Sequence, residues 1–319
     1  MKIIEFKYSQ VVALLKEIDP LFVELDNSNI DNNIGFALSS SKNKIESGLY
    51  FLTNEYSSEA DTIYNSLILV DYVPEKKDTN IYIKVKNPQL AHYKISASIE
   101  KKNAPGIHVT AIISPDAQIA ASAYIGPFCI VGNCIIEDNV SLLGHITISD
   151  NVVIKQNTEI EANSLIGARG MAWIWDEDGT RVMQPQLGGV IIEEDCLLGS
   201  DISIVRGSLS ENTIVGKGTV MAHGTKIGHG SVIGKYVHLA NNVSLAGNAQ
   251  IGDRVFLGSA CVVSPNVFIA EGCIVGAGSV VNKSVHEPHS TIVGVPGKVI
   301  NKDNFEYKPK GAPKPFKNK

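Results

Sequence analysis

The sequence predicts a mainly β fold, a solenoid of short parallel strands preceded by a small α/β domain. Two observations predict it. From residue 104 to residue 300, a large aliphatic residue, once a Met, recurs at every sixth position over long stretches. A period of six fits neither an α-helix nor a simple alternating strand. Residues 1–103 lack this repeat and contain segments with the spacing of helices and strands.

Residues 1–103 are predicted to form the α/β domain. The segment SQVVALLKEID has helical spacing, and NSLILVDYV and NIYIKVK are typical of strands. Helical spacing resumes in NPQLAHYKISASIEKK. The stretch KNAPGIH, with its Pro and Gly, indicates the domain boundary.

Residues 104–300 are predicted to form the solenoid, because the repeat stays in phase over long runs. The longest run is Val215, Met221, Ile227, Ile233, Leu239, Leu245, Ile251, Leu257, Val263, Ile269, Val275 and Val281. An earlier run is Ile107, Ile113, Ile119, Ile125, then, after a slip of one residue, Ile136, Leu142, Ile148, Ile154, Ile160 and Ile166. A short third run, Ile192, Leu198 and Ile204, ends in a second slip near SLSEN. Three strands joined by sharp corners then give a coil of about 18 residues, stacked on the next at about 4.8 Å.

Two segments stand outside the repeat. Residues 168–189 interrupt it and carry both tryptophans, Trp173 and Trp175. A loop of this length is uncommon and often functional, although an arm that packs on a neighbouring subunit is an alternative. Residues 301–319 are rich in Lys and Pro and are predicted to be a flexible basic tail.

The composition excludes several classes of function. The net charge of −5 does not favour a nucleic-acid surface. No apolar run is long enough to cross a membrane, and charges interrupt the apolar N-terminus, so we expect no secretory signal. The five cysteines include no CxxC pair and are expected to be reduced thiols. A cytoplasmic protein is predicted.

Two histidines have the spacing of the repeat. His223 and His229 lie six residues apart and therefore occupy different corners of a coil. Gly247 follows His229 by one full coil, so the two residues are expected to stack about 5 Å apart. An imidazole beside an exposed backbone N–H suits acyl transfer: the imidazole removes a proton from the nucleophile, and the N–H stabilises the oxyanion.

The segment KIGHGSVIGKYVHLANNVSLAGNAQIG resembles the catalytic region of the hexapeptide-repeat UDP-3-O-acylglucosamine N-acyltransferases. The resemblance places His229 on the catalytic histidine and Gly247 on the oxyanion glycine, and it implies a left-handed parallel β-helix. QPQLGGVIIEEDCLLGS and IVRGSL resemble the family's segments after its inserted loop. FLTNEY resembles its uridine-binding stretch, with Phe51, Asn54 and Tyr56 as the base-binding residues.

The resemblance implies an N-acyltransferase acting on a nucleotide-linked amino sugar, UDP- or dTDP-linked, in the synthesis of lipid A or another surface polysaccharide. It implies a homotrimer without a metal or a tightly bound cofactor. His223, Trp173 and Trp175 are candidate substrate contacts. The family has Asp-Asn where this chain has Ala222-His223.

The acyl donor is expected to be a thioester, either acyl-CoA or an acyl carrier protein. The segment GVPGKVI resembles the CoA-dependent acetyltransferases of the wider superfamily, which puts Lys298 near the CoA phosphates. A Lys298 that only closes the last coil is the alternative.

Two other functions are compatible with the same residues. Some left-handed β-helices hydrate carbon dioxide on a zinc ion held by histidines of neighbouring subunits, and His223, His229 and His238 are candidates for such ligands. A non-catalytic trimeric scaffold is the other alternative. A metal assay separates the first from acyl transfer, and substitution of His229 separates the second.

Overall fold

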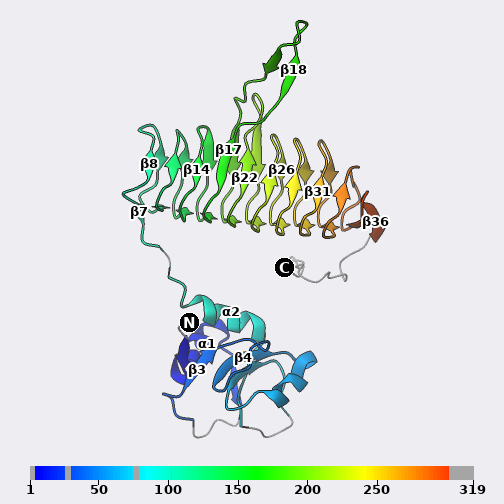
Figure 1. The fold of residues 1–319 in the computed structure, drawn as a ribbon. Coiled ribbons are helices and arrows are strands. Elements are labelled where there is room, and N and C mark those ends of the chain that lie inside the picture. The colour runs from blue at the N-terminus through cyan, green and yellow to red at the C-terminus, as the bar shows by residue number, and fades with distance from the viewer. Residues whose placement is uncertain (1–3, 26–29, 75–78, 102, 302–319) are drawn as a thin grey trace. The chain divides into compact units, whose positions relative to one another are not determined.

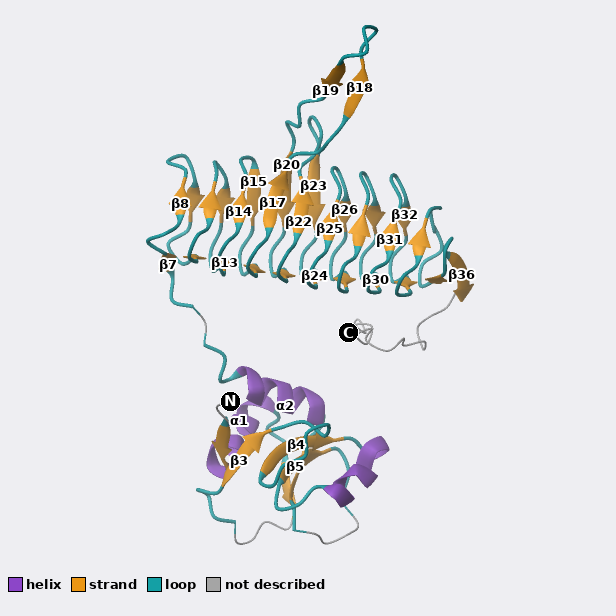
Figure 2. Cartoon of the chain, in the orientation of Figure 1, coloured by secondary structure: helices purple, strands orange, loops and turns teal. Residues whose placement is uncertain are grey.

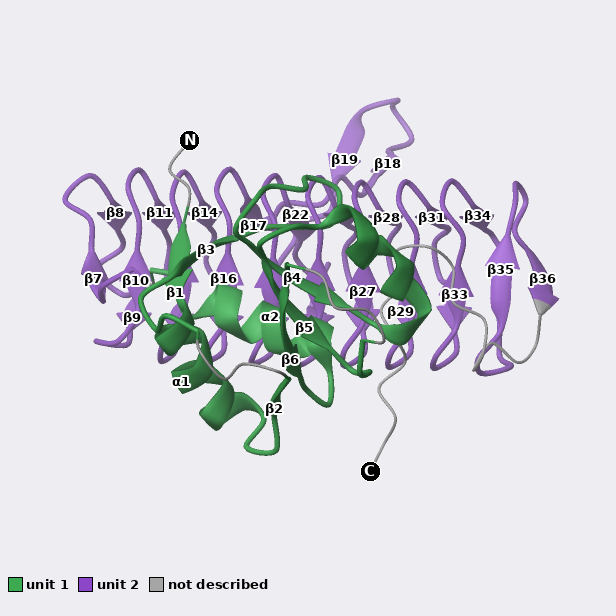
Figure 3. Cartoon of the chain, turned by 90° about the horizontal axis from the view of Figure 1, so that it is seen from below, with its two compact units in different colours: residues 1–102 green, residues 103–319 purple. Residues whose placement is uncertain are grey.

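The computed structural model describes residues 4–25, 30–74, 79–101 and 103–301. They belong to two compact units, Met1–Lys102 and Asn103–Lys319, which Figure 3 shows in different colours. Apart from Asn301, the predicted tail lies outside the described residues. No helix in the described ranges is long and apolar enough to cross a lipid bilayer.

The first unit is a six-stranded sheet with the order β1-β3-β4-β5-β6-β2. The four middle strands are parallel, and the edge strands β1 and β2 are antiparallel to their neighbours. The strands are β1 (Glu5–Lys7), β2 (Val23–Leu25), β3 (Gly35–Leu38), β4 (Gly48–Leu52), β5 (Leu67–Val70) and β6 (Ile81–Lys84). The helices are α1 (Tyr8–Ile18), the 3-10 helix η1 (Asn54–Thr62) and α2 (Pro88–Ala97).

Helices cover both faces of this sheet. One core joins α1 and α2 to one face, and a second core joins η1 to the other. Burial on both faces explains why the strand Leu67–Val70 is apolar throughout. The two helices and two strands expected here from the sequence are confirmed. At α2, the Asn87 side chain accepts a hydrogen bond from the Leu90 N–H and Pro88 follows the cap, which fixes where the helix begins.

The second unit is a parallel β-helix, seen in Figure 1 as a row of stacked coils, and it confirms the predicted solenoid. Each of its three sheets takes one strand from each successive coil.

Sheet 1 contains β7 (Gly106–Ile107), β10 (Tyr124–Ile125), β13 (Ser141–Leu142), β16 (Glu159–Ile160), β21 (Leu197–Leu198), β24 (Val220–Met221), β27 (His238–Leu239), β30 (Phe256–Leu257), β33 (Ile274–Val275), β35 (Thr291–Val293) and the antiparallel end strand β36 (Lys298–Asn301). Sheet 2 contains β8 (Ile112–Ile113), β11 (Ile130–Val131), β14 (Thr147–Ile148), β17 (Leu165–Ala168), β22 (Ser203–Val205), β25 (Lys226–Ile227), β28 (Ser244–Leu245), β31 (Val262–Val263) and β34 (Val280–Val281). Sheet 3 contains β9 (Gln118–Ile119), β12 (Ile135–Ile136), β15 (Val152–Ile154), β20 (Gly189–Ile192), β23 (Asn212–Val215), β26 (Val232–Ile233), β29 (Gln250–Ile251) and β32 (Phe268–Ile269).

The register of these sheets confirms the 18-residue coil. Ile227 pairs with Leu245, and Leu245 pairs with Val263. The slip of one residue is also present, because Ile125 pairs with Leu142, one position short of a full coil. The repeated aliphatic side chains fill one continuous core inside the helix. Ile107 is an exception: it is about half exposed because its coil has a neighbour on one side only.

The segment 168–189, expected to be a loop, contains an antiparallel hairpin. Its strands are β18 (Trp173–Trp175) and β19 (Arg181–Met183), and Figure 2 shows it projecting from the β-helix. A second, shorter insertion follows β22. Its effect is visible in the register, since Ser203 pairs with Lys226 rather than with the residue 18 positions on.

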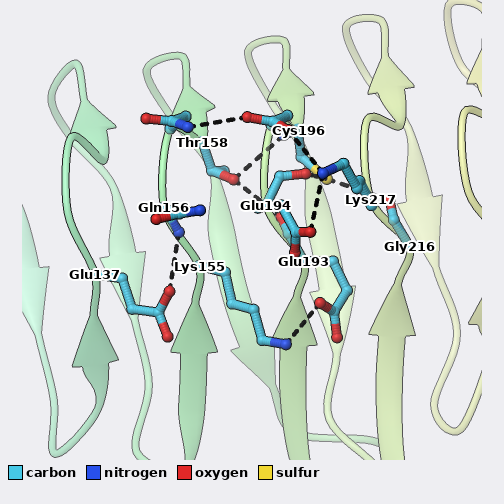
Figure 4. A network of polar contacts seen from close by, with 11 residues as sticks. Glu137, Lys155, Gln156, Thr158, Glu193, Glu194, Cys196, Gly216 and Lys217 are labelled. Carbon is cyan, nitrogen blue, oxygen red and sulfur yellow. Dashed lines mark hydrogen bonds and ion pairs between the residues drawn. The ribbon is translucent and has the colours of Figure 1, made fainter.

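Polar side chains bind neighbouring coils together on the outside. In the network of Figure 4, the Lys217 ammonium pairs with Glu194 at 3.1 Å and with Asp195 at 3.3 Å. Beside it, Lys155 donates to Glu193 at 2.7 Å. These pairs join successive coils at their outer surface, where each ion pair contributes little on its own. The stability of the unit therefore comes mainly from the aliphatic core.

Candidate active site

One edge of the β-helix, the corner between sheets 2 and 3, gathers the irregular parts of the unit. The insertion with the hairpin leaves β17 and returns at β20, and the loop 206–211 joins β22 to β23. His229 lies between β25 and β26, and Gly247 lies between β28 and β29. Successive coils therefore line up the insertion, the loop, the histidine and the glycine along one edge.

His229 and Gly247 stack as their spacing predicts. The Asn248 N–H donates to the His229 carbonyl at 2.7 Å, which fixes the two corners in register. A Cβ atom at Gly247 would lie 2.5 Å from His229 Nε2, too close for any side chain. The glycine therefore leaves the imidazole room to lie against the backbone of the next coil.

The Gly247 N–H donates no hydrogen bond within the described ranges of the chain. At the same repeat position on another corner, the Lys235 N–H donates to Asp253 at 2.8 Å, which shows that a side chain of the next coil can pair the amide at this position. One coil after Gly247 the corresponding residue is Pro265, whose side chain accepts no hydrogen bond. An unpaired amide beside an imidazole can donate to an oxyanion.

The other ring nitrogen of His229 contacts a residue that the sequence alone did not indicate. Ser208 Oγ lies 3.2 Å from His229 Nδ1. Ser208 is held by Glu211, whose carboxylate accepts the N–H groups of Ser208 at 2.6 Å and Leu209 at 3.1 Å. Bonds from the Glu211, Ser208 and Leu209 amides, and from the Ser208 side chain, lower the pKa of Glu211 to about 2.

The loop that carries Ser208 is bonded to the base of the hairpin insertion. The Leu187 N–H donates to the Ser208 carbonyl at 2.8 Å. The Arg206 side chain donates to the carbonyls of Gly167 at 3.0 Å and Asp150 at 2.9 Å. The insertion and the loop therefore form one hydrogen-bonded assembly beside His229.

His223 lies on a different corner, between sheets 1 and 2, as expected. Its Nδ1 accepts the Ser200 N–H at 2.9 Å. Glu161 lies 3.7 Å from the same nitrogen, but a nitrogen that accepts an amide proton carries none to share with a carboxylate. His223 therefore caps a backbone amide. It lies against Gly199, but the Gly199 N–H already donates to the Met221 carbonyl at 2.7 Å, so the two histidines have different surroundings.

Both tryptophans lie in the hairpin, which leaves the β-helix at the corner that also holds His229. Their rings meet edge to face at 4.8 Å, and both are partly exposed. The Arg181 guanidinium lies 5.1 Å from the Trp173 ring and 5.7 Å from the Trp175 ring. The pair is thus a small preformed aromatic surface.

The three predicted nucleotide contacts lie near the end of β4. Phe51 is a half-buried strand residue whose ring contacts His92 at 5.2 Å and Tyr93 at 6.4 Å. Asn54 begins η1 and Tyr56 lies within it, about half exposed. In the described part of the unit, no ring contact or hydrogen bond joins Phe51 to either residue. Tyr93, an exposed residue of α2, is an aromatic neighbour of Phe51. The sequence did not indicate this contact, because the two residues belong to different elements that only the fold brings together.

Lys298 begins β36, the antiparallel strand that ends sheet 1. It is not among the residues gathered at the His229 corner. Within the described ranges of a single chain, no group of three or more His, Cys, Asp or Glu side chains is arranged to hold a metal ion. The five cysteines are buried and free of disulfides, and burial raises the pKa of the Cys261 thiol to about 12.

The chain is similar to known hexapeptide-repeat proteins and to named acyltransferases. The family described as bacterial transferase hexapeptide (six repeats) matches residues 248–283, and the hexapeptide repeat of succinyl-transferase matches residues 189–207. The UDP-3-O-acylglucosamine N-acyltransferase of Coxiella burnetii (strain RSA 493 / Nine Mile phase I) is 37% identical over 153 residues, which cover 41% of this chain and 44% of that protein. Its counterpart from Polynucleobacter asymbioticus is 28% identical over 164 residues, covering 43% and 46%. The chain spans less than half the length of these two relatives.

Solved structures of acyltransferases are also similar to this chain. The UDP-N-acetylglucosamine O-acyltransferase (LpxA) of Moraxella catarrhalis RH4 has a TM-score of 0.57 and 30% identity, covering 62% of this chain and 74% of that chain. The UDP-N-acetylglucosamine acyltransferase of Francisella novicida has a TM-score of 0.56 and 28% identity, covering 62% and 71%. The chain belongs to the hexapeptide-repeat acyltransferases, and its second unit is a left-handed parallel β-helix of their kind.

Proposed function

We propose that this protein is an N-acyltransferase that moves an acyl group from a thioester to the amino group of a nucleotide-linked amino sugar. The observation that carries the proposal is the stack of His229 on Gly247, with the glycine N–H unpaired within the described ranges. The relatives are named as acyltransferases of UDP-linked glucosamine derivatives, which supports a nucleotide-linked amino sugar as the acceptor. The product would enter lipid A or another surface polysaccharide.

The chemistry follows from these two groups. The amine nitrogen attacks the thioester carbonyl carbon while His229 Nε2 takes a proton from that nitrogen. The carbonyl oxygen becomes an oxyanion and accepts the Gly247 N–H. The tetrahedral intermediate then collapses, the carbon–sulfur bond breaks, and the imidazolium returns the proton to the thiolate. The step needs no metal.

The remaining predicted contacts belong to the same proposal. In the first unit, Phe51 would stack on uracil, with Asn54 reading the edge of the base and Tyr56 as a second aromatic. Trp173 and Trp175 would contact the acyl chain or the sugar. His223 would contact the substrate of a neighbouring subunit.

The donor is proposed to be acyl-CoA or an acyl carrier protein, and Lys298 would approach the phosphates of CoA. A UDP-linked acceptor is favoured over a dTDP-linked one by the names of the relatives. We propose a cytoplasmic homotrimer, in which neighbouring β-helices complete one another's sites.

The proposal is tested by incubating the protein with UDP- and dTDP-linked amino sugars and with acyl-CoA and acyl carrier protein donors, and by detecting the N-acylated sugar by mass spectrometry. With the best pair, the substitution His229→Ala should lower kcat about 10²-fold to 10⁴-fold, because it removes the general base. The matched variant His223→Ala should lower kcat less than about 10-fold, since His223 caps an amide at another corner.

Other outcomes point elsewhere. Full kcat in His229→Ala would remove His229 from the role of base. If His223→Ala had the large effect and His229→Ala the small one, the alignment of His229 with the family's catalytic histidine would be wrong. Stoichiometric zinc in the purified protein, with hydration of carbon dioxide, would favour the zinc enzyme, and no activity of either kind would favour a scaffold.

A further inference from the structure

Ser208 and Glu211 surround the ring nitrogen of His229 that faces away from Gly247. Ser208 Oγ lies 3.2 Å from His229 Nδ1, while Nε2 faces the glycine. A histidine can act as a base through Nε2 only when the neutral ring carries its proton on Nδ1. The identity of the group beside Nδ1 therefore decides whether Nε2 is available.

The hydroxyl oxygen of Ser208 lies where it can accept a proton from the ring. Glu211 holds the backbone of Ser208 in place by accepting its N–H at 2.6 Å. A serine hydroxyl has one proton to donate and two lone pairs that accept. Because the loop holds Ser208 Oγ 3.2 Å from His229 Nδ1, one of these lone pairs can accept the ring proton. That arrangement favours the tautomer with the proton on Nδ1.

The position of Ser208 is itself fixed by the backbone. Glu211 holds the loop through the N–H groups of Ser208 and Leu209. The Leu187 N–H, from the base of the insertion, binds the Ser208 carbonyl. The residue after the histidine is held as well, since the Gly230 N–H donates to the Thr213 hydroxyl at 2.9 Å. Both sides of the His229–Ser208 contact are therefore constrained.

We propose that Ser208, oriented by Glu211, is a positioning residue that holds His229 in the tautomer with a free Nε2. This inference rests on the proposed function for its catalytic meaning, but not for its structural content. It also gives the 206–211 insertion a purpose: the extra residues bring a serine and a carboxylate to the corner where the base lies.

The test compares Ser208→Ala with Ser208→Thr and with the control Ser210→Ala. Ser210 lies in the same loop, is exposed, and has no part in the site. Imidazole ¹⁵N spectra of histidine-labelled protein read the tautomer directly, and the His229 signals are assigned by their loss in His229→Gln. The chain has 8 histidines, so the spectra remain simple.

In the wild type and in Ser210→Ala, we expect His229 to be protonated on Nδ1 in its neutral form. Ser208→Ala should move the proton towards Nε2 and lower kcat about 10-fold to 100-fold with little change in KM, because the ring is no longer oriented. Ser208→Thr keeps a hydroxyl and should restore the wild-type tautomer and most of the activity.

An unchanged His229 tautomer in Ser208→Ala would overturn the proposal, even if activity fell, because the serine would then act only through packing. Equal losses in Ser208→Ala and Ser208→Thr would do the same. If the wild type transfers no acyl group to any acceptor, the proposed function fails, while the spectra still decide whether Ser208 sets the tautomer.

Discussion

At the scale of single residues, the His229 imidazole occupies the space that a side chain at Gly247 would need. A Cβ there would lie 2.5 Å from His229 Nε2. Gly247→Ala should therefore displace the ring and crowd the oxyanion position, and it should lower kcat about 10²-fold. The melting temperature should stay near that of the wild type, because the residue lies at a corner outside the core.

Asn241→Ala is the matched control for this prediction, because Asn241 occupies the same repeat position one corner earlier and is exposed. Steady-state kinetics and thermal melting of both variants are the measurements. Wild-type kcat in Gly247→Ala would show that neither the ring nor the oxyanion lies where the stack puts them.

A second prediction at this scale concerns the pH dependence of stability and rests on Glu211. Its carboxyl has a pKa of about 2 in the folded protein, against 4.5 for the free group, because its own amide and those of Ser208 and Leu209 bind the ionised form. Its contribution to stability is therefore complete above about pH 4.5 and is lost as the pH falls towards 2.

Glu211→Gln removes this titration, so its melting temperature should fall less than that of the wild type between pH 5 and pH 2.5. Calorimetric melting of both proteins across that range is the measurement. Parallel curves for the two proteins would mean that the Glu211 carboxylate does not hold the loop in solution.

At the scale of elements, tryptophan fluorescence reports on the hairpin β18–β19 alone, because the chain has only two tryptophans and both lie there. Arg181 covers both rings, so Arg181→Ala should shift the tryptophan emission towards that of exposed indole. If the hairpin contacts substrate, adding the acyl donor or the sugar nucleotide should change the emission of the wild type. Lys226→Ala, whose side chain binds Asp201 away from the hairpin, is the control. Emission that no substrate alters would favour an arm that only packs on a neighbouring subunit.

The elements also show how far the sequence predicts this fold. The core side chains could be predicted because each inward position repeats with the coil, and the shortened coil appeared as a slip between Ile125 and Ile136. The strand Gly48–Leu52 was not identified, since a short run buried on both faces has no alternating pattern. The sequence predicts a loop where the hairpin lies, because residues 168–189 stand outside the repeat and its period therefore does not reveal their strands.

The site was predicted where the repeat is regular and missed where it is not. His229 and Gly247 are one coil apart, so counting residues places them together. Ser208 and His229 are 21 residues apart, a spacing that matches no coil, because Ser208 lies within the inserted loop 206–211. Only the folded chain shows which residue of an irregular loop reaches the imidazole.

At the scale of the whole molecule, the outward face of sheet 2 suggests how copies associate. Ile112, Ile130 and Leu165 lie in register on it, linked through Thr147, and all three are exposed in the single chain. Aliphatic residues aligned along a flat face mark a surface that another copy can bury. A β-helix with three flat faces suits threefold association, so we predict a homotrimer.

Sedimentation at micromolar concentration should give three times the 34.3 kDa mass of the chain. Ile130→Glu places a charge in the middle of this stripe and should shift the protein towards monomer, because burying an unpaired carboxylate is costly. Ser141→Glu is the control: Ser141 faces outward on sheet 1 at nearly the same level of the helix. A trimer that survives Ile130→Glu but not Ser141→Glu would move the interface to sheet 1. A monomeric wild type would contradict the threefold assembly. It would also rule out the proposed role of His223, because no neighbouring subunit would bring a substrate to it.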